Sequence, residues 1–392
     1  MRLYNTMTRD KDEVQPIADP VTMYVCGVTP YDTTHLGHAR TYLLFDVLQR
    51  YLLHLGMSVT YVQNVTDVDD PLIERANSLG IDYLELAAKY VDIFLADLTD
   101  MNVIMPTHYP RATQEIPGII ETIERLIDMD MAYVKNGSVY FRATRFPGYG
   151  AMGRLSREEM LEADRETGES PDDPNKEDPL DFRLWLAAQP NEPTWESPWG
   201  LGRPGWHIEC STMANRYLGP RIDIHGGGAD LVFPHHCSEI AQSETANGVG
   251  PFCQYWVHVA LVWMDGEKMS KSRGNMAFAR DLIPLYGGDA LRYYLIETHY
   301  RERLEYFPED MAAAAERWRG ISAVLRGSRE GSPSSEGIDI RDRFFAAMHD
   351  DLDTPTALQA TRDLAELVRR TDSPGDRRLL ESLLQVLGFR LD

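Results

Sequence analysis

Hydrophobic residues recur in the first part of the chain with the period of a strand, then of a helix, then of a second strand. The apolar run 23–27 predicts a buried strand, and apolar positions at helical spacing predict a helix over 36–55. The run "VTYVQNV" (Val59–Val65) predicts the next strand. This order is typical of a βαβ unit with a parallel sheet. Ligands of such a sheet bind beyond the carboxyl ends of its strands, so we expect a site where the 36–55 helix begins.

The rest of the chain alternates between apolar and polar stretches. We expect helices over 81–101 and 117–128, a hairpin within 137–150, a polar excursion outside the core over 155–193, a return of the apolar pattern at 205–214 and 222–233, mainly helices after 277, a loop at 327–337, and two or three amphipathic helices over 338–392. This order indicates a smaller domain inserted between two halves of one doubly wound α/β sheet.

Composition narrows the class of protein. The chain has 392 residues, of which 43% are hydrophobic, so it can form two or three domains. No apolar run approaches the roughly 20 residues of a membrane span, and the first residues are too polar for a secretory signal. We therefore expect a cytoplasmic protein without membrane contact. The four cysteines form no C-x-x-C pair, which leaves buried thiols or metal ligands as the alternatives.

The formal net charge of −22 bears on nucleic-acid binding. Affinity for nucleic acid comes largely from Lys and Arg side chains that neutralise phosphates, and the chain has only six lysines. A local basic groove is compatible with a negative total charge. The excess of acidic over basic residues nevertheless argues against a long RNA footprint.

Two short motifs carry phosphate chemistry. The stretch H-L-G-H places His35, Gly37 and His38 at the start of the predicted helix, where free N–H groups and two imidazoles face a phosphate. A pair of surface histidines is the simpler reading of this motif alone. The stretch "GEKMSKSRGN" (266–275) holds Lys268 and Lys271 in a Gly/Ser loop, where two ammonium groups can neutralise a triphosphate and departing pyrophosphate.

Cysteines and histidines gather in three further stretches. Cys26 follows the first strand, Cys210 ends "PGWHIEC", and "DLVFPHHCSE" holds His235, His236, Cys237 and Glu239. Thiolate and imidazole ligands suit Zn²⁺, and an open coordination position would admit a substrate thiolate. A hydroxyl would bind far more weakly, so such a site would reject serine. A buried core is the alternative reading of scattered cysteines.

The H-L-G-H and K-M-S-K-S motifs, in this order, resemble those of class I aminoacyl-tRNA synthetases. The resemblance implies a Rossmann catalytic domain and ATP-dependent activation of an amino acid as its adenylate, with Mg²⁺ accompanying ATP. It implies His35, His38, Lys268 and Lys271 as catalytic residues. The implied domains are a catalytic domain in two halves (1–110 and 200–276), an inserted connective domain (111–199), a stem region with the catalytic loop (277–310) and a helical bundle without an anticodon-binding domain (311–392).

Further stretches, including "YVCG", "NVTDVDD", "PGWHIEC" and "FPHH..EIAQSE", resemble the cysteine-activating branch. In that branch the zinc ligands match Cys26, Cys210, His235 and Glu239, with Cys237 or water as alternatives for the fourth. Thr66 would hold the substrate amino group, Trp206 would close over the cysteine, and 226–230 would bind adenosine. The segment "TDVDD" lacks the Gly and distal Glu of a calcium loop. The ligand-contacting residues implied by the resemblance are Cys26, Gly27, Val28, Thr29, Gly37, Thr41, Asn64, Val65, Thr66, Trp206, Gly228, Ala229, Asp230 and Val262.

Two families share this activation chemistry and differ in the acceptor. The mycothiol-pathway cysteine ligase forms an amide with glucosaminyl-inositol, and "GVTPYDTTHLGHA", "DPLIERA", the segment 166–171 and the end after "LLQVLGFRLD" resemble it. Cysteinyl-tRNA synthetase forms an ester with tRNA, and "DIHGGG", "HHCSEIAQSE" and Arg40 resemble it. We expect the ligase, as a monomer or weak dimer, with a cysteine–tRNA ligase as the alternative. Asp230 or water are candidates for the general base, and a catalytically silent binding module is the hypothesis from another class.

Overall fold

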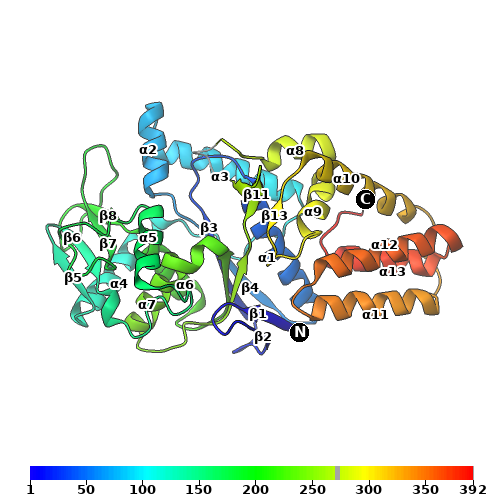
Figure 1. Ribbon diagram of the computed structural model, residues 1–392, viewed down its shortest axis with the longest axis horizontal. Coiled ribbons are helices and arrows are strands. Elements are labelled where there is room, and N and C mark those ends of the chain that lie inside the picture. Colours follow the sequence, from blue (N-terminus) through cyan, green and yellow to red (C-terminus); the bar gives the residue numbers. More distant parts are fainter. Residues whose placement is uncertain (270–273, 392) are drawn as a thin grey trace.

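A parallel sheet forms the centre of the molecule (Figure 1). The computed structural model describes residues 1–269 and 274–391. The sheet has the strand order β10-β9-β3-β4. Its strands are β3 (Val21–Val28), β4 (Val59–Val65), β9 (Ile222–Gly228) and β10 (Cys253–Val259). The chain passes from β3 to β4 on one side and from β9 to β10 on the other, which puts the switch point of the sheet between β3 and β9.

Helices cover both faces of this sheet. Helix α1 (Leu36–His54) contacts β4, β9 and β10, whereas α6 (Trp206–Leu218) contacts β3 and β4 and packs against α7 (Cys237–Asn247). Right-handed crossovers that run in opposite directions along the sheet place α1 and α7 on opposite faces. The predicted strand, helix and strand over 23–65 are thereby confirmed, each to within about two residues.

A second, antiparallel sheet lies at one end of the molecule (Figure 1). It has the order β5-β6-β7-β8. Its elements and the helices beside it are β5 (Ala132–Lys135), β6 (Ser138–Phe141), β7 (Phe182–Ala187), β8 (Gly202–Pro204), α4 (Ile116–Asp128) and α5 (Arg157–Glu166). Phe182, Leu184 and Trp185 of β7 are buried, so the prediction that 155–193 lies outside the core is wrong for this strand. The Pro, Asp and Glu residues on either side of the strand masked its short apolar run.

Smaller elements precede or follow the parallel strands along the chain. Two helices follow β4, a three-stranded sheet in the order β12-β11-β13 follows β10, and a hairpin starts the chain. Their bounds are α2 (Asp70–Leu79), α3 (Tyr83–Asp100), β11 (Val262–Met264), β12 (Glu267–Lys268), β13 (Leu304–Glu305), β1 (Arg2–Asn5) and β2 (Asp10–Glu13).

Helices make up the C-terminal part of the chain. They are α8 (Ala279–Tyr286), α9 (Gly288–Ile296), α10 (Pro308–Ser322), α11 (Ser335–His349), α12 (Thr354–Thr371) and α13 (Pro374–Val386). The last three form the end of the molecule opposite the antiparallel sheet (Figure 1), which agrees with the two or three helices predicted there. Among the helices of residues 1–269 and 274–391, none combines the length and apolar character that crossing a membrane requires.

A buried ion pair joins the parallel sheet's helix α1 to the C-terminal part. Arg292 of α9 lies 2.6 Å from Asp46 of α1, and both side chains are fully buried. The same guanidinium donates to the carbonyls of Met101 and Leu387. Arg50 also contacts Asp46, at 2.9 Å. Four segments distant in sequence therefore meet at one pair of charges.

We expect the substitution Arg292→Met to lower the free energy of unfolding by about 3–5 kcal/mol, because it leaves Asp46 buried with one cation fewer. Urea denaturation followed by circular dichroism measures the change. The control is Arg319→Met, which removes an exposed pair with Glu316 and should change stability by less than about 0.5 kcal/mol. Equal losses in the two variants would contradict a stabilising role for the buried pair.

Candidate active site

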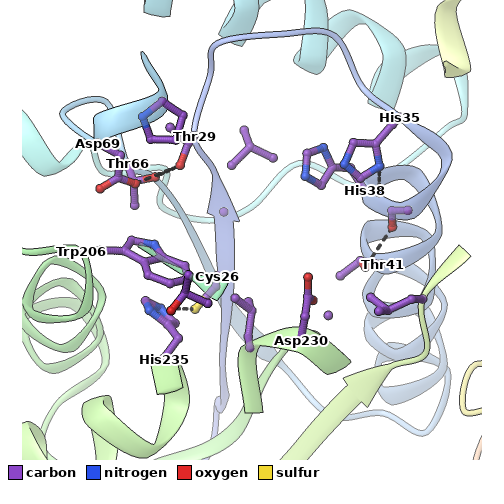
Figure 2. A pocket seen from close by; sticks show the side chains of 18 of the residues that line it. Cys26, Thr29, His35, His38, Thr41, Thr66, Asp69, Trp206, Asp230 and His235 are labelled. Atoms are coloured by element: carbon purple, nitrogen blue, oxygen red, sulfur yellow. Dashed lines mark hydrogen bonds between the residues drawn. The ribbon is translucent and has the colours of Figure 1, made fainter. Parts of the chain in front are cut away.

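A cavity of about 730 Å³ opens at the carboxyl ends of β3 and β9, beside the first turn of α1. Figure 2 shows its walls: the histidine pair on one side, Thr29, Thr66 and Asp69 on another, and Cys26, Trp206 and His235 below them. Of the residues predicted from sequence, the lining includes Cys26, Gly27, Val28, Thr29, His35, Gly37, His38, Thr41, Thr66, Trp206, Cys210, Gly228, Asp230, His235, Val262 and Lys268. Lys271 lies outside the described residues.

The histidine pair is built into the start of α1. His35 is the N-cap residue, and its Nδ1 accepts a hydrogen bond from the backbone N–H of His38 at 3.2 Å. The two rings stack with centroids 3.7 Å apart. A Cβ at position 37 would lie 2.9 Å from the His35 ring, so this packing requires Gly37. Both imidazoles are thereby held at the positive end of the helix, where an anion is stabilised.

The strand ends are held close together behind the cavity. The backbone N–H of Gly27 donates to the Asn64 side chain at 2.8 Å, and a Cβ on Gly27 would lie 1.5 Å from the Asn64 carbonyl oxygen. The Asn64 amide also contacts the Cys210 sulfur at 3.4 Å. Asn64 and Val65 are buried, so they support the cavity from behind rather than line it.

The four predicted metal ligands come together in the interior. One donor atom from each of Cys26, Cys210, His235 and Glu239 lies within 4.8 Å of every other. Cys26 Sγ is 3.4 Å from His235 Nε2 and 3.4 Å from Glu239 Oε1. Cys237 stands apart from this cluster, and burial first of all raises the pKa of its thiol to about 11. The geometry thus favours Glu239 over Cys237 in the donor set.

The charges of this cluster suit a cation. Burial by itself would raise the pKa of the Cys210 thiol, but a hydrogen bond from Cys26 and the charge of His235 lower it to about 6. Burial also opposes ionisation of Glu239, yet His225 and His235 bring the pKa of that carboxyl to about 2. Two anionic donors therefore meet in a buried place, which is the charge arrangement that a bound divalent cation neutralises. The soft and imidazole donors match zinc chemistry.

Further histidines surround this cluster, and sequence reasoning missed their arrangement. Cys26, His225, His236 and Glu239 form a second possible donor group, whose donor atoms also lie within 4.8 Å of one another. His225 Nε2 lies 3.0 Å from Glu239 Oε2, and His207 Nδ1 lies 2.9 Å from His235 Nδ1. His236 contacts Cys26 at 3.4 Å and continues to His258 at 2.8 Å. Hydrogen bonds of this kind fix the ring orientation of metal-binding histidines and the direction of carboxylates. In the sequence, the only sign of this histidine arrangement was the position of His235 and His236 shortly before Glu239.

The lysine of the 266–275 loop reaches the same cavity from the other side. Lys268 Nζ lies 3.1 Å from Asp230 Oδ2, and both side chains are about half exposed. Asp230 and Ala229 belong to a short turn after β9 (Ala229–Leu231). A Cβ at Gly226 would lie 1.9 Å from the Phe45 ring, so the glycines let the β9 backbone pack closely on α1.

Comparison with known proteins places the chain in a family. Residues 13–316 match the family model of the tRNA synthetases class I (C) catalytic domain. The fold is that of this family of ATP-dependent ligases, which act on amino acids. The chain belongs to the class I (C) tRNA synthetases.

Relatives and solved structures agree with this placement. The chain is 44% identical to a cysteine–tRNA ligase of Dehalococcoides mccartyi, over all of this chain and 86% of the relative. It is also 44% identical to a cysteine–tRNA ligase of Cronobacter sakazakii, over 99% of this chain and 85% of that protein. The fold resembles Mycobacterium tuberculosis methionyl-tRNA synthetase in complex with methionyl-adenylate, with a TM-score of 0.65 and 15% identity over 94% of this chain and 89% of that one. The expected class I fold is confirmed.

Proposed function

We propose that this protein activates L-cysteine with ATP and transfers the cysteinyl group to tRNA. One observation carries the choice of cysteine: the cavity that holds His35, His38 and Lys268 also reaches the donor set around Cys26. Cysteine–tRNA ligases of several organisms are 43–46% identical to this chain. Their names favour the tRNA acceptor over the amino sugar that the sequence motifs indicated.

The donor set supports a zinc ion that selects the substrate. Cys26, Cys210, His235 and Glu239 would hold it, and His225 and His207 would orient Glu239 and His235 from behind. When bound, Zn²⁺ would supply a soft partner for the thiolate of cysteine. Serine has no thiolate and would bind this ion more weakly. The Trp206 ring, stacked on His235 with centroids 4.2 Å apart, would exclude water from this part of the cavity.

The proposed activation step uses side chains from two sides of the cavity. A carboxylate oxygen of cysteine attacks the α-phosphorus of ATP, the bond between the α-phosphorus and its bridging oxygen breaks, and pyrophosphate leaves. His35 and His38, fixed at the helix start, would stabilise the charge on the transferring phosphoryl group. Lys268 would leave its contact with Asp230 to neutralise the pyrophosphate. Lys271 remains a proposed partner of Lys268, as in the sequence motif.

The transfer step consumes the adenylate. A hydroxyl oxygen of the tRNA end attacks the acyl carbon, AMP leaves with the bonding electron pair, and the hydroxyl proton passes to a base. Asp230 remains a candidate for that base because it lines the cavity.

A second acceptor, the amine of glucosaminyl-inositol, stays a candidate because of the charge distribution. The chain carries a net charge of −22, and arginines of the C-terminal helices are paired with carboxylates of the same region. These pairs include Arg343–Asp363, Arg369–Glu366 and Arg370–Glu336. Arginines that are paired with carboxylates offer less positive charge to the phosphates of tRNA than unpaired ones. A small acceptor without phosphates does not need a basic surface.

The test of the acceptor uses the purified protein with ATP, labelled cysteine, and either cysteine tRNA or glucosaminyl-inositol. We expect the label to appear on tRNA, in a linkage that mild base cleaves, as an ester requires. Label on the amino sugar in a base-stable amide would contradict this expectation and establish the second candidate. Cysteine-dependent exchange of pyrophosphate into ATP, measured in parallel, tests activation itself, and its absence would refute both.

We expect Lys268→Ala to reduce the turnover of cysteine-dependent pyrophosphate exchange by about 10²–10³-fold, the loss typical of removing one group that stabilises transition-state charge. The KM for cysteine should stay within about threefold, because the lysine does not face the donor set. Lys11→Ala is the control. Lys11 belongs to the N-terminal hairpin and pairs with Asp350, and neither residue lines the cavity. Near-normal exchange in the Lys268 variant would refute the role.

We expect about one zinc ion per chain, and a large loss of bound zinc in Cys210→Ser, because a hydroxyl is a poor replacement for a thiolate ligand. Mass spectrometry of the metal content gives the readout. Cys253→Ser is a matched control, because Cys253 is also a buried free cysteine but belongs to neither possible donor group among the described residues. Similar losses in both variants, or zinc-free parent protein, would argue against the site.

A further inference from the structure

Arg40 of α1 is a buried cation that no carboxylate balances. Only 2% of the residue is exposed, and no acidic side chain in the described ranges 1–269 and 274–391 forms an ion pair with it. Burial lowers the pKa of its guanidinium to about 10, so the group is still charged at neutral pH. Arg292, which is also buried, pairs with Asp46. A buried charge without a counter-ion is costly, so other groups must compensate for the charge of Arg40.

Backbone carbonyls take the place of a counter-ion. The Nη1 group of Arg40 donates to the Ala260 carbonyl at 3.0 Å. Its Nη2 group donates to the carbonyls of His299 and Glu302, each at 2.8 Å. Ala260 follows β10 and lines the cavity, and its own N–H donates to the Tyr300 carbonyl at 2.8 Å. The two branches of one guanidinium therefore join α1 to the cavity wall and to the chain before β13.

This stretch of chain leads to the strand that carries Lys268. It continues into β13, which pairs with β11 through Leu304 and Val262, and Figure 1 shows the two strands side by side. β11 pairs in turn with β12, where Trp263 lies opposite Lys268. Two strand pairings therefore connect the carbonyls that bind the guanidinium to the lysine that we propose neutralises pyrophosphate.

The chain after the 266–275 loop contacts the start of α1 directly. The N–H of Leu36, the first residue of the helix, donates to the Ala277 carbonyl at 3.0 Å. His35 and Phe278 form an isolated antiparallel bridge beside this bond. Residues at both ends of the loop are thus connected to α1, at one end through the guanidinium and β13 and at the other by backbone contacts. The histidine pair and the lysine share one support.

We propose that Arg40 is a positioning residue for activation, which sets the separation between the histidine pair at the start of α1 and Lys268 on β12. Both groups must meet one triphosphate, and a misplacement of about 1 Å can reduce a rate by about 100-fold. Arg40 would contact no substrate and would act through the backbone that it binds. Arginine suits this role because its planar fork binds acceptors on two sides, whereas an ammonium is a point charge. This inference rests on the proposed activation of cysteine and adds the residue that couples its two phosphate-binding sides.

The variant Arg40→Lys keeps the charge but loses the fork. We expect the turnover of cysteine-dependent pyrophosphate exchange to fall by about 10–100-fold, because the histidine pair and the lysine no longer keep their separation. The KM for cysteine should change by less than about threefold, and the zinc content should stay at the parent level, since Arg40 makes no contact with the donor set around Cys26. Parent-like turnover in this variant would overturn the proposal.

Arg377→Lys is the matched control. Arg377 is 5% exposed and donates to the carbonyls of Val324 and Ser328, and it also contacts Asp372. These partners all belong to the C-terminal part of the chain, so the turnover of exchange should stay within about twofold of the parent. A loss as large as that of Arg40→Lys would show that removing any buried fork impairs the enzyme, which would contradict a specific role for Arg40.

A double variant distinguishes positioning from a general structural role. If Arg40 acts by placing Lys268, its replacement matters little once that lysine is gone. In the Lys268→Ala background we therefore expect Arg40→Lys to reduce the turnover of exchange by less than about threefold further. A merely structural role would instead multiply the two losses, and that outcome would overturn the proposal.

A second variant covers the case in which the lysine variant does not fold, which circular dichroism and urea denaturation would reveal. Arg40→Gln removes the buried charge and keeps two N–H donors on one amide group. We expect the same loss of turnover as in Arg40→Lys and the same small further effect in the Lys268→Ala background. Multiplied losses in a folded Arg40→Gln protein would refute the positioning role.

The outcomes separate this inference from the proposed function. Absence of exchange in the unsubstituted protein would remove the proposed activation of cysteine. Normal exchange in the parent together with unchanged turnover in Arg40→Lys would leave that activation intact and overturn only the role of Arg40.

Discussion

The crevice that holds the candidate site exists because the chain leaves two adjacent parallel strands toward opposite sides of the sheet. β3 continues to β4 in one direction and β9 continues to β10 in the other, so no connection covers the space beyond their carboxyl ends. Close backbone packing keeps that space in shape, since Gly27 lies against the Asn64 carbonyl and Gly226 against Phe45. Cys26 and Asp230 reach the cavity from these two strand ends, whereas Cys210 comes from α6 and Lys268 from β12.

Charges of opposite sign occupy different walls of this one cavity. The start of α1 and Lys268 form the side suited to phosphates, whereas the anionic donors Cys210 and Glu239 form the side suited to a cation. In the proposed reaction, the triphosphate of ATP would face the first side, and the metal that binds the cysteine thiolate would occupy the second. Under the proposed function, the cavity would orient the two substrates by electrostatics before any chemistry takes place.

The C-terminal helices are fixed to the catalytic part at buried charges rather than by a flexible tether. Besides the Arg292–Asp46 pair, Asp351 is fully buried between α11 and α12, where it accepts hydrogen bonds from Tyr300, Arg301 and the Tyr4 backbone. Because an unpaired buried charge is costly, these contacts define one arrangement of the helices relative to α1. Asp46 belongs to the same helix whose start positions His35 and His38, so the anchoring and the site share α1.

The sequence determined the local elements and the types of chemistry. Helical and strand periodicity located β3, α1 and β4, the H-L-G-H stretch located the histidine pair at a helix start, and the thiol and imidazole residues indicated a metal. Such signals are readable because burial period and capping depend on neighbours along the chain. Only the tertiary structure decided which distant residues meet. It brought Cys26 to Glu239, placed His225 beside Glu239, separated Cys237 from this cluster, and buried β7 within a polar stretch. These contacts depend on strand order and packing across hundreds of residues, which no local pattern encodes.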